Sequence, residues 1–218
     1  MQEIAETLRA KSVFDGTVER ELAALWEYGV LRVSDSRLKP ALIYFLQAEA
    51  PWTFFVYGAS ATGKNHPYWQ RERAGMRNTT ECCLVIDRQL RAYPEFTDEK
   101  FNVLSGHRDI VLIATILSDT FKAGSGEDDE GQLSSQGSDP KQGAVAAQRW
   151  NNVARHFQIE SHVRDSIYEA IYWHLGRFTP GWNRDIRLSA YTEVTHRIDM
   201  FMSDKNLEIL FDPKKLIS

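Results

Sequence analysis

A buried helix is predicted by the stretch His107-Arg-Asp-Ile-Val-Leu-Ile-Ala-Thr-Ile-Leu-Ser-Asp-Thr-Phe-Lys-Ala-Gly124. A buried helix is expected over Ile110–Phe121, because no charged residue interrupts its first eight residues, Ile110–Leu117, which is typical of a helix at the centre of a core. The polar residues gather at its end, where Ser118, Asp119 and Lys122 would face a site. This stretch therefore predicts both the middle of the fold and the place where chemistry is expected.

Further helices are predicted on both sides, because apolar residues recur at three- and four-residue spacing. Asn78 or Thr79 would open one of them as a capping residue, and Pro94 would follow its end. The helical segments expected are Val18–Tyr28, Leu38–Ala48, Asn78–Tyr93, Asp98–Leu104, Ala146–Phe157, Val163–Leu175 and Leu188–Met202. We therefore expect an all-α fold with few or no short strands, and a single helical domain over residues 1–218.

Four segments depart from the helical pattern. Trp52–Tyr57 is aromatic and β-branched, which predicts a strand or an extended buried segment. Residues 58–75 are rich in glycine and polar residues, and predict a loop. Residues 124–145 are expected to form a flexible loop or insertion, because Gly124–Pro140 has one large apolar residue, Leu133. Leu207–Phe211 would pack as a short strand or a final turn.

Composition limits the class of protein. The 218 residues are 43% hydrophobic and 11% aromatic, enough for a substantial core. A formal charge of −4 predicts no strong non-specific binding to nucleic acid. The adjacent Cys82 and Cys83 favour a reduced cytoplasmic core over a disulfide. No apolar run approaches the roughly 20 residues that span a bilayer, so no membrane association is expected.

A phosphate-binding loop is one candidate motif. Gly58-Ala-Ser-Ala-Thr-Gly-Lys64 fits G-x-x-x-x-G-K and follows the strand-like Trp52–Tyr57. A second strand, carrying a magnesium-binding aspartate, would then be Ile110–Asp119. Against this, Asn65 stands where the motif needs a serine or threonine, and the surrounding helices lack the alternating strands of an α/β sheet. The other interpretation is a Gly-rich surface loop.

A second set of motifs spreads over most of the chain. Its parts are Ala59–Pro67, Ala74–Thr79, Ser118-Asp119, Trp173–Phe178 and Thr195–Asp199. In this order and at roughly this spacing, the segments resemble the phage and bacterial members of the HD phosphohydrolase superfamily. The resemblance runs from about residue 52 to 204, and no single motif is exact. It implies a helical HD-domain fold. It also implies a protein of the bacterial cytoplasm, encoded either by a phage or by the bacterium itself.

The resemblance also implies a metal site. The first ligand position of the family falls on Asn78, the middle pair on Ser118 and Asp119, and the last on Asp199. Family members use two imidazoles and two carboxylates to hold a divalent ion that activates water. Here asparagine and serine replace both imidazoles. His156 and His174 would rebuild the site, with Mg²⁺ or Mn²⁺ as the ion if any is bound.

Other residues acquire roles by the same resemblance. Lys122 would act beside Asp119 by contacting phosphate as a point charge, and Lys64, His66 and Arg177 would bind substrate. Several of the candidate site residues also have a purely structural interpretation. Asp119 would be a capping or ion-paired residue, Lys122 a solvated side chain, and His174 a core histidine beside Trp173. Arg177 would then be an ordinary surface residue.

Three functions follow from these patterns. Loss of both core imidazoles favours a non-catalytic HD-fold protein that binds a protein partner or a nucleotide, because losing metal ligands costs orders of magnitude in activity. The alternative is a metal-dependent nucleotide phosphohydrolase or phosphodiesterase that uses Asp119 and Asp199. A nucleotide binder acting through Gly58–Lys64 is the third. Metal binding near Asp119 distinguishes the first two.

Overall fold

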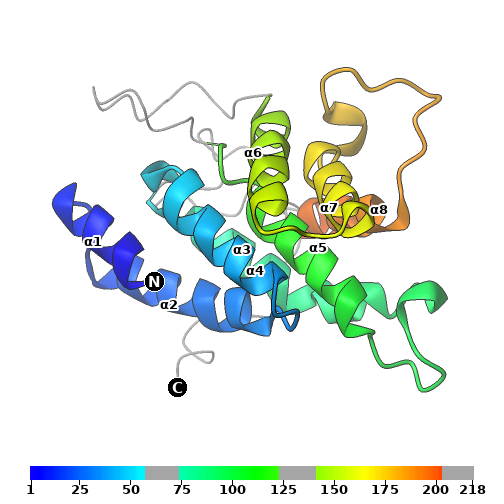
Figure 1. Ribbon diagram of the computed structural model, residues 1–218, viewed down its shortest axis with the longest axis horizontal. Coiled ribbons are helices and arrows are strands. Elements are labelled where there is room, and N and C mark those ends of the chain that lie inside the picture. The colour runs from blue at the N-terminus through cyan, green and yellow to red at the C-terminus, as the bar shows by residue number, and fades with distance from the viewer. Residues whose placement is uncertain (57–73, 123–140, 203–218) are drawn as a thin grey trace.

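The computed structural model describes residues 1–56, 74–122 and 141–202. Within these ranges the chain forms eight α-helices and no β-sheet, so the expected all-α class is confirmed (Figure 1). The helices are α1 (Gln2–Ala10), α2 (Gly16–Tyr28), α3 (Leu38–Tyr44), α4 (Ala74–Leu90), α5 (Ser105–Ser118), α6 (Gln142–His156), α7 (Ser161–Tyr172) and α8 (Ala190–Met202).

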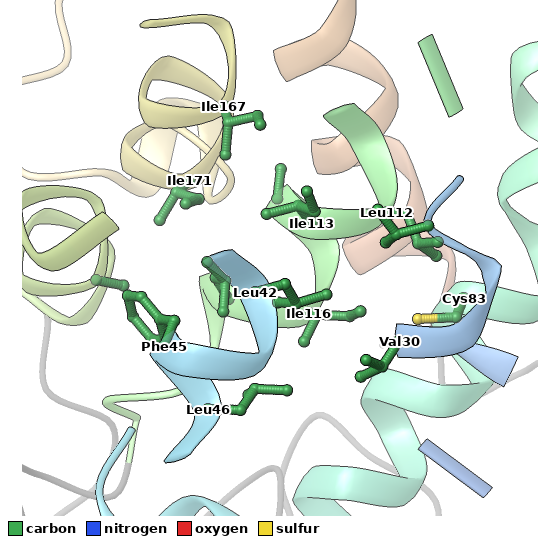
Figure 2. Packing of buried hydrophobic residues seen from close by; sticks show 14 of the residues in the cluster. Val30, Leu42, Phe45, Leu46, Cys83, Leu112, Ile113, Ile116, Ile167 and Ile171 are labelled. Carbon is green, nitrogen blue, oxygen red and sulfur yellow. The ribbon is translucent and has the colours of Figure 1, made fainter. Parts of the chain in front are cut away.

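Helix α5 forms the centre of the molecule. Every residue from Asp109 to Ser118 is buried, and the helix packs against α4, α6, α7 and α8. Figure 2 shows Ile113 and Ile116 of α5 near Leu42 of α3, with Ile167 and Ile171 of α7 close by. Burying an aliphatic side chain of this size contributes about 1.5–3 kcal/mol. The uninterrupted apolar run therefore fixes α5 inside the bundle, and its polar end lies among the neighbouring helices.

Polar side chains begin α2 and join the N-terminal part of the chain to α5. Asp15 caps α2, because its carboxylate accepts from the backbone N–H groups of Thr17 and Val18, both at 3.0 Å. The carboxylate of Asp109, fully buried on α5, accepts from the backbone N–H and the hydroxyl of Ser34. It also accepts from the backbone N–H of Asp35 at 2.8 Å. The segment between α2 and α3 is thereby held against α5.

Two local predictions are wrong. Trp52–Phe55 forms a short 3₁₀ helix instead of a strand or an extended segment, because Pro51 leads into a turn in which the N–H of Phe54 bonds the Pro51 carbonyl. Asp98–Leu104 is a turn instead of a helix, closed by an isolated bridge between Thr97 and Val103. The carboxylate of Asp98 accepts from the N–H groups of Lys100 and Asn102, which favours the turn over a helix.

Several helix limits also differ from prediction. Helix α4 begins at Ala74, inside the expected loop 58–75, and α6 begins at Gln142, inside the expected loop 124–145. Gly176 follows the end of α7 with a φ of 56°, and a Cβ there would lie 2.8 Å from the His196 ring. Residues 58–73 and 124–140 of these loops and the segment 207–211 lie outside the described residues. No described helix has the length and apolar character needed to cross a membrane.

Candidate functional site

Three helices place polar side chains around one small cavity of about 10 Å³. Each helix contributes a pair of residues four positions apart, which lie on one face of a helix. The pairs are Asn78 and Cys82 on α4, Thr115 and Asp119 at the end of α5, and Thr195 and Asp199 on α8. Ser118 and Thr79 complete the lining. A space of this size holds about one water molecule.

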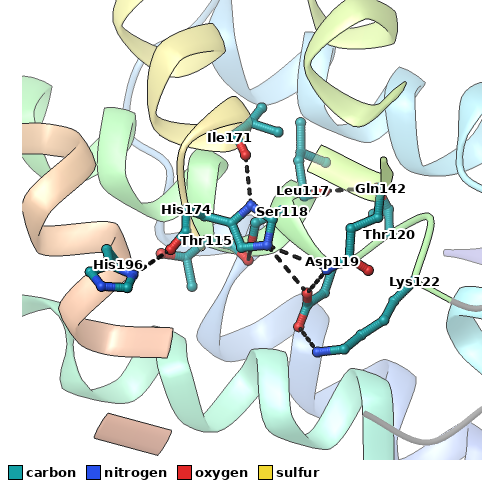
Figure 3. A network of polar contacts seen from close by, with 10 residues as sticks. All are labelled: Thr115, Leu117, Ser118, Asp119, Thr120, Lys122, Gln142, Ile171, His174 and His196. Carbon is teal, nitrogen blue, oxygen red and sulfur yellow. Dashed lines mark hydrogen bonds and ion pairs between the residues drawn. The ribbon is translucent and has the colours of Figure 1, made fainter. Parts of the chain in front are cut away.

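Asp119 lies where α5 ends and has cationic and polar neighbours. The ammonium of Lys122 donates to its Oδ2 at 3.1 Å, and the amide of Gln142 donates to its Oδ1 at 3.3 Å (Figure 3). The side chains of Lys122 and Asp119 are only 17% and 11% exposed. An ion pair shielded to this degree is screened much less by salt than a surface pair.

His174 approaches the same carboxylate from the end of α7. It is 1% exposed, and its Nδ1 lies 2.7 Å from the Ile171 carbonyl oxygen. A carbonyl only accepts, so Nδ1 carries the proton in the neutral ring and Nε2 keeps a lone pair. That Nε2 lies 3.5 Å from the Gln142 amide nitrogen and 3.7 Å from Asp119 Oδ1. His174 is thus a buried histidine whose ring is oriented toward Asp119.

The charges of this site shift the pKa values of their neighbours. Burial, with the nearby charge of Asp119, raises the pKa of Asp199, although Lys122, His174 and His196 oppose the change. Burial lowers the pKa of Lys122, but the charges of Asp119 and Asp199 outweigh it and leave that pKa raised. Lys122 is therefore an ammonium at neutral pH, and it offsets part of the repulsion between the two carboxylates.

Asn78 and Ser118, the two residues expected in place of imidazoles, differ in their bonding. Asn78 is 2% exposed, and its Oδ1 has no hydrogen-bond partner within the described part of the chain. The hydroxyl of Ser118 donates back to the Thr115 carbonyl at 3.1 Å, a bond within its own helix. An unpaired buried carbonyl is costly, so Asn78 Oδ1 is a candidate acceptor for a water or another donor in the cavity.

The structure does not bring every predicted site residue to this place. His156 is exposed at the last position of α6, where its ring lies 5.8 Å from the ring of Tyr44. Gln142, which bonds Asp119, begins α6, and His156 ends the same helix. About 20 Å of helix therefore lies between His156 and the residue that contacts Asp119. The expected ligand role of His156 is therefore corrected. Arg177 is also exposed, with its guanidinium 5.0 Å above the ring of Phe178.

The phosphate-loop interpretation loses its structural context. Its glycine-rich loop, together with Lys64 and His66, lies outside the described residues. The two segments that would be strands are described, and both are helical: Trp52–Phe55 and Ile110–Ser118. A loop of this kind depends on a preceding strand and on the sheet that contains it. The described residues provide neither.

Sequence reasoning did not single out several residues of this site, among them Cys82, Thr195 and Gln142. Cys82 and Thr195 lie four positions from Asn78 and Asp199, so helical periodicity would have placed them on the same faces. Burial raises the pKa of the Cys82 thiol well above its usual value, and the charge of Asp199 adds to the effect. Gln142 gave no such signal, because it belongs to a segment expected to be a loop.

A divalent metal ion does not fit the described residues as they stand. No three His, Cys, Asp or Glu side chains in ranges 1–56, 74–122 and 141–202 converge closely enough to hold one. The unpaired oxygen of Asn78 is a hard ligand of the kind that Mg²⁺ or Mn²⁺ accepts. However, the ammonium of Lys122 already bonds Asp119 and lies close enough to Asp199 to shift its pKa.

Comparison of the chain with models of protein families, with curated proteins and with solved structures found no match. The geometry of the site itself must therefore carry any functional conclusion.

Proposed function

We propose that this chain is a non-catalytic binding protein built on an HD-like helical scaffold, with a protein partner or a nucleotide as its ligand. In this proposal Lys122 takes the position that a metal ion has in HD phosphohydrolases. The observation that carries it is the 3.1 Å bond from the Lys122 ammonium to Asp119, made beside Asp199 in a nearly buried site.

The convergence of four residues supports the HD-like part of the proposal. Asn78, Ser118, Asp119 and Asp199 occupy the four ligand positions of the family motif, and all four line one cavity. They come from three different helices and span more than half of the chain. A chance resemblance in sequence does not require such residues to meet.

The electrostatics support the loss of catalysis. A divalent ion would have to compete with the Lys122 ammonium for Asp119. Displacing the ammonium from Asp119 costs the energy of a shielded ion pair. The replaced imidazoles reduce what the ion would gain in return, because a neutral amide and a hydroxyl are weaker ligands. The balance favours the internal ion pair over a bound metal.

The metal-dependent phosphohydrolase stays the alternative, and two observations favour it. The Oδ1 atom of Asn78 has no partner among the described residues, and Nε2 of His174 keeps a lone pair near Asp119. With Lys122 displaced, these atoms would join Asp119 and Asp199 as hard or borderline ligands.

Metal stoichiometry separates the two functions. Purified protein, Lys122→Met and Asp119→Asn are each incubated with Mn²⁺, and the bound ion is measured together with hydrolysis of a phosphodiester. We expect no bound ion and no hydrolysis in the unsubstituted protein, whereas Lys122→Met gains affinity for Mn²⁺. Lys100→Met, which removes an exposed charge elsewhere, is the matched control. About one ion per chain, lost in Asp119→Asn and accompanied by hydrolysis, would establish the phosphohydrolase instead.

A further inference from the structure

A second and larger cavity, of about 250 Å³, opens where α6 begins and α7 ends. Lys141, Gly143 and Ala144 line it from the start of α6, and Tyr172 and Thr179 line it from the end of α7 and the turn that follows. His174 also lines it, and the Nε2 atom of that ring lies 3.7 Å from Asp119 Oδ1. This cavity therefore lies next to the site of Asp119, although the two cavities share none of their described lining residues.

The walls of this cavity favour a negative charge. The first N–H groups of a helix have no partner within that helix, and the helix dipole places a partial positive charge there. Lys141, at the N-cap position of the 15-residue α6, adds a full positive charge beside them. No carboxylate is among the described residues that line the cavity.

Thr179 provides an independent sign of a ligand. It is 8% exposed, and its Oγ1 is buried with no hydrogen-bond partner in the described ranges. Its backbone is fixed, because its N–H donates to the Gly176 carbonyl at 3.0 Å. A buried hydroxyl without a partner costs free energy. Because Thr179 lines the cavity, a turn of its side chain would let the hydroxyl donate to an oxygen-rich ligand there and remove that cost.

Gly143 explains why the two helix ends come so close. A Cβ at this position would lie 3.0 Å from the Ile171 carbonyl oxygen and 3.1 Å from the ring of His174. The glycine therefore lets the first turn of α6 pack directly on the last turn of α7. This close approach places the start of α6 and Thr179 around the same space.

We propose that this cavity binds the phosphate group of a small molecule, between the first turn of α6, the ammonium of Lys141 and the hydroxyl of Thr179. The start of a helix is a general site for phosphate, because its N–H groups and its dipole both act on the anion. The volume is below the 300–1,000 Å³ of sites for larger ligands, which limits the ligand to a small phosphomonoester. Tyr172 and Pro180 offer an apolar wall for the organic part. This inference does not rest on the proposed function.

Calorimetric titration with inorganic phosphate, adenosine monophosphate and adenosine tests the proposal. The titrations are made at low salt with EDTA present, so their outcome is independent of any metal at Asp119. We expect saturable binding of both phosphate-bearing molecules and none of adenosine. Equal affinity for the two assigns recognition to the phosphate alone, and tighter binding of the monophosphate adds the apolar wall. No binding of either, or adenosine binding as tightly as its monophosphate, would overturn the proposal.

Two variants locate the binding. Lys141→Met should weaken it roughly tenfold, the usual loss for a charge-assisted bond. Thr179→Val should weaken it too, without lowering the melting temperature, because no partner among the described residues loses a bond. Thr192→Val is the matched control: this buried hydroxyl lies 3.0 Å from Ser189 Oγ, so its loss should lower the melting temperature and leave the affinity unchanged. Unchanged affinity in both cavity variants would place the binding elsewhere and refute the proposal.

Discussion

His174 turns the Nε2 atom of its ring toward Asp119, 3.7 Å from Oδ1, because its Nδ1 atom lies 2.7 Å from the Ile171 carbonyl oxygen. The two residues come from different helices, and Gln142 from a third helix bonds the same Asp119 oxygen. Three helices therefore determine the orientation of one imidazole. Such orientation of a buried ring by a backbone carbonyl is common where the other nitrogen binds a ligand or a charge.

The tautomer of His174 can be observed directly. We expect the neutral ring to carry its proton on Nδ1, because the Ile171 carbonyl at 2.7 Å only accepts. Long-range ¹H–¹⁵N correlation spectra distinguish the two ring nitrogens by chemical shift. The assignment is made by comparison with His174→Gln, whose spectrum lacks these signals. A protonated Nε2 with a bare Nδ1 in the neutral ring would contradict the hydrogen bonding described here.

Removal of the Lys122 charge should destabilise the fold. Lys122→Met leaves Asp119 and Asp199 without their shared cation in a poorly solvated site, at a cost of about 3 kcal/mol. Urea denaturation measures the change in the free energy of unfolding. Adding Asp119→Asn should restore much of it, since one of the repelling charges is then gone. Equal stability of Lys122→Met and Lys100→Met would show that the ion pair contributes nothing.

The ionisation of Asp199 should lower the stability of the protein at neutral pH, compared with its stability at an acidic pH where an ordinary carboxyl group is half protonated. Burial, with the charge of Asp119, raises its folded-state pKa above 3.8, so folding favours its protonated form. The associated stability is fully present below the unfolded-state pKa and is lost as pH rises through the raised folded-state pKa. Asp199→Asn should therefore be the more stable protein at pH 7, with a difference that shrinks on acidification. Melting temperatures across this range measure it, with the exposed Asp185→Asn as the control for net charge.

Both cysteines should be unreactive in the native protein. Burial raises the pKa of Cys82 well above its usual value and that of Cys83 to about 12, so neither forms the nucleophilic thiolate near pH 8. An aromatic disulfide reagent should titrate no thiol in buffer and two in urea. Because Cys82 lines the small cavity, its rate of modification also reports opening of that site. Fast reaction of one thiol in buffer would show that the site is accessible.

The sequence was most informative where apolar patterning was strong. Helix α5 follows from its uninterrupted run, and Asn78, Ser118, Asp119 and Asp199 line one cavity. The first turn of α6 was mistaken for a loop because Gln142 and Gly143 carry no apolar signal. These residues are buried by contact with α7, and such tertiary contacts override local composition.

The pairing of Lys122 was not apparent from sequence either. Three residues after Asp119, it was expected to contact phosphate or water, because spacing along the chain does not reveal burial. Only the packing of α4, α5 and α8 shows that its ammonium bonds Asp119 and also interacts with the charge of Asp199, a residue far away in the sequence. The prediction for His156 was wrong for the opposite reason. Its place in the order of the motif agreed with a ligand role, but it lies at the end of α6 that is far from Asp119.

The buried carboxylate of Asp109 has a consequence for how the protein folds. It joins α5 to residues 34 and 35, about 75 positions earlier in the chain. A contact over this separation forms only after a large loop has closed, which slows folding and couples distant segments. If α1 and α2 separated from the bundle and took Ser34 with them, an uncompensated charge would be left in the interior. The first two helices should therefore unfold together with α5, in a single cooperative step.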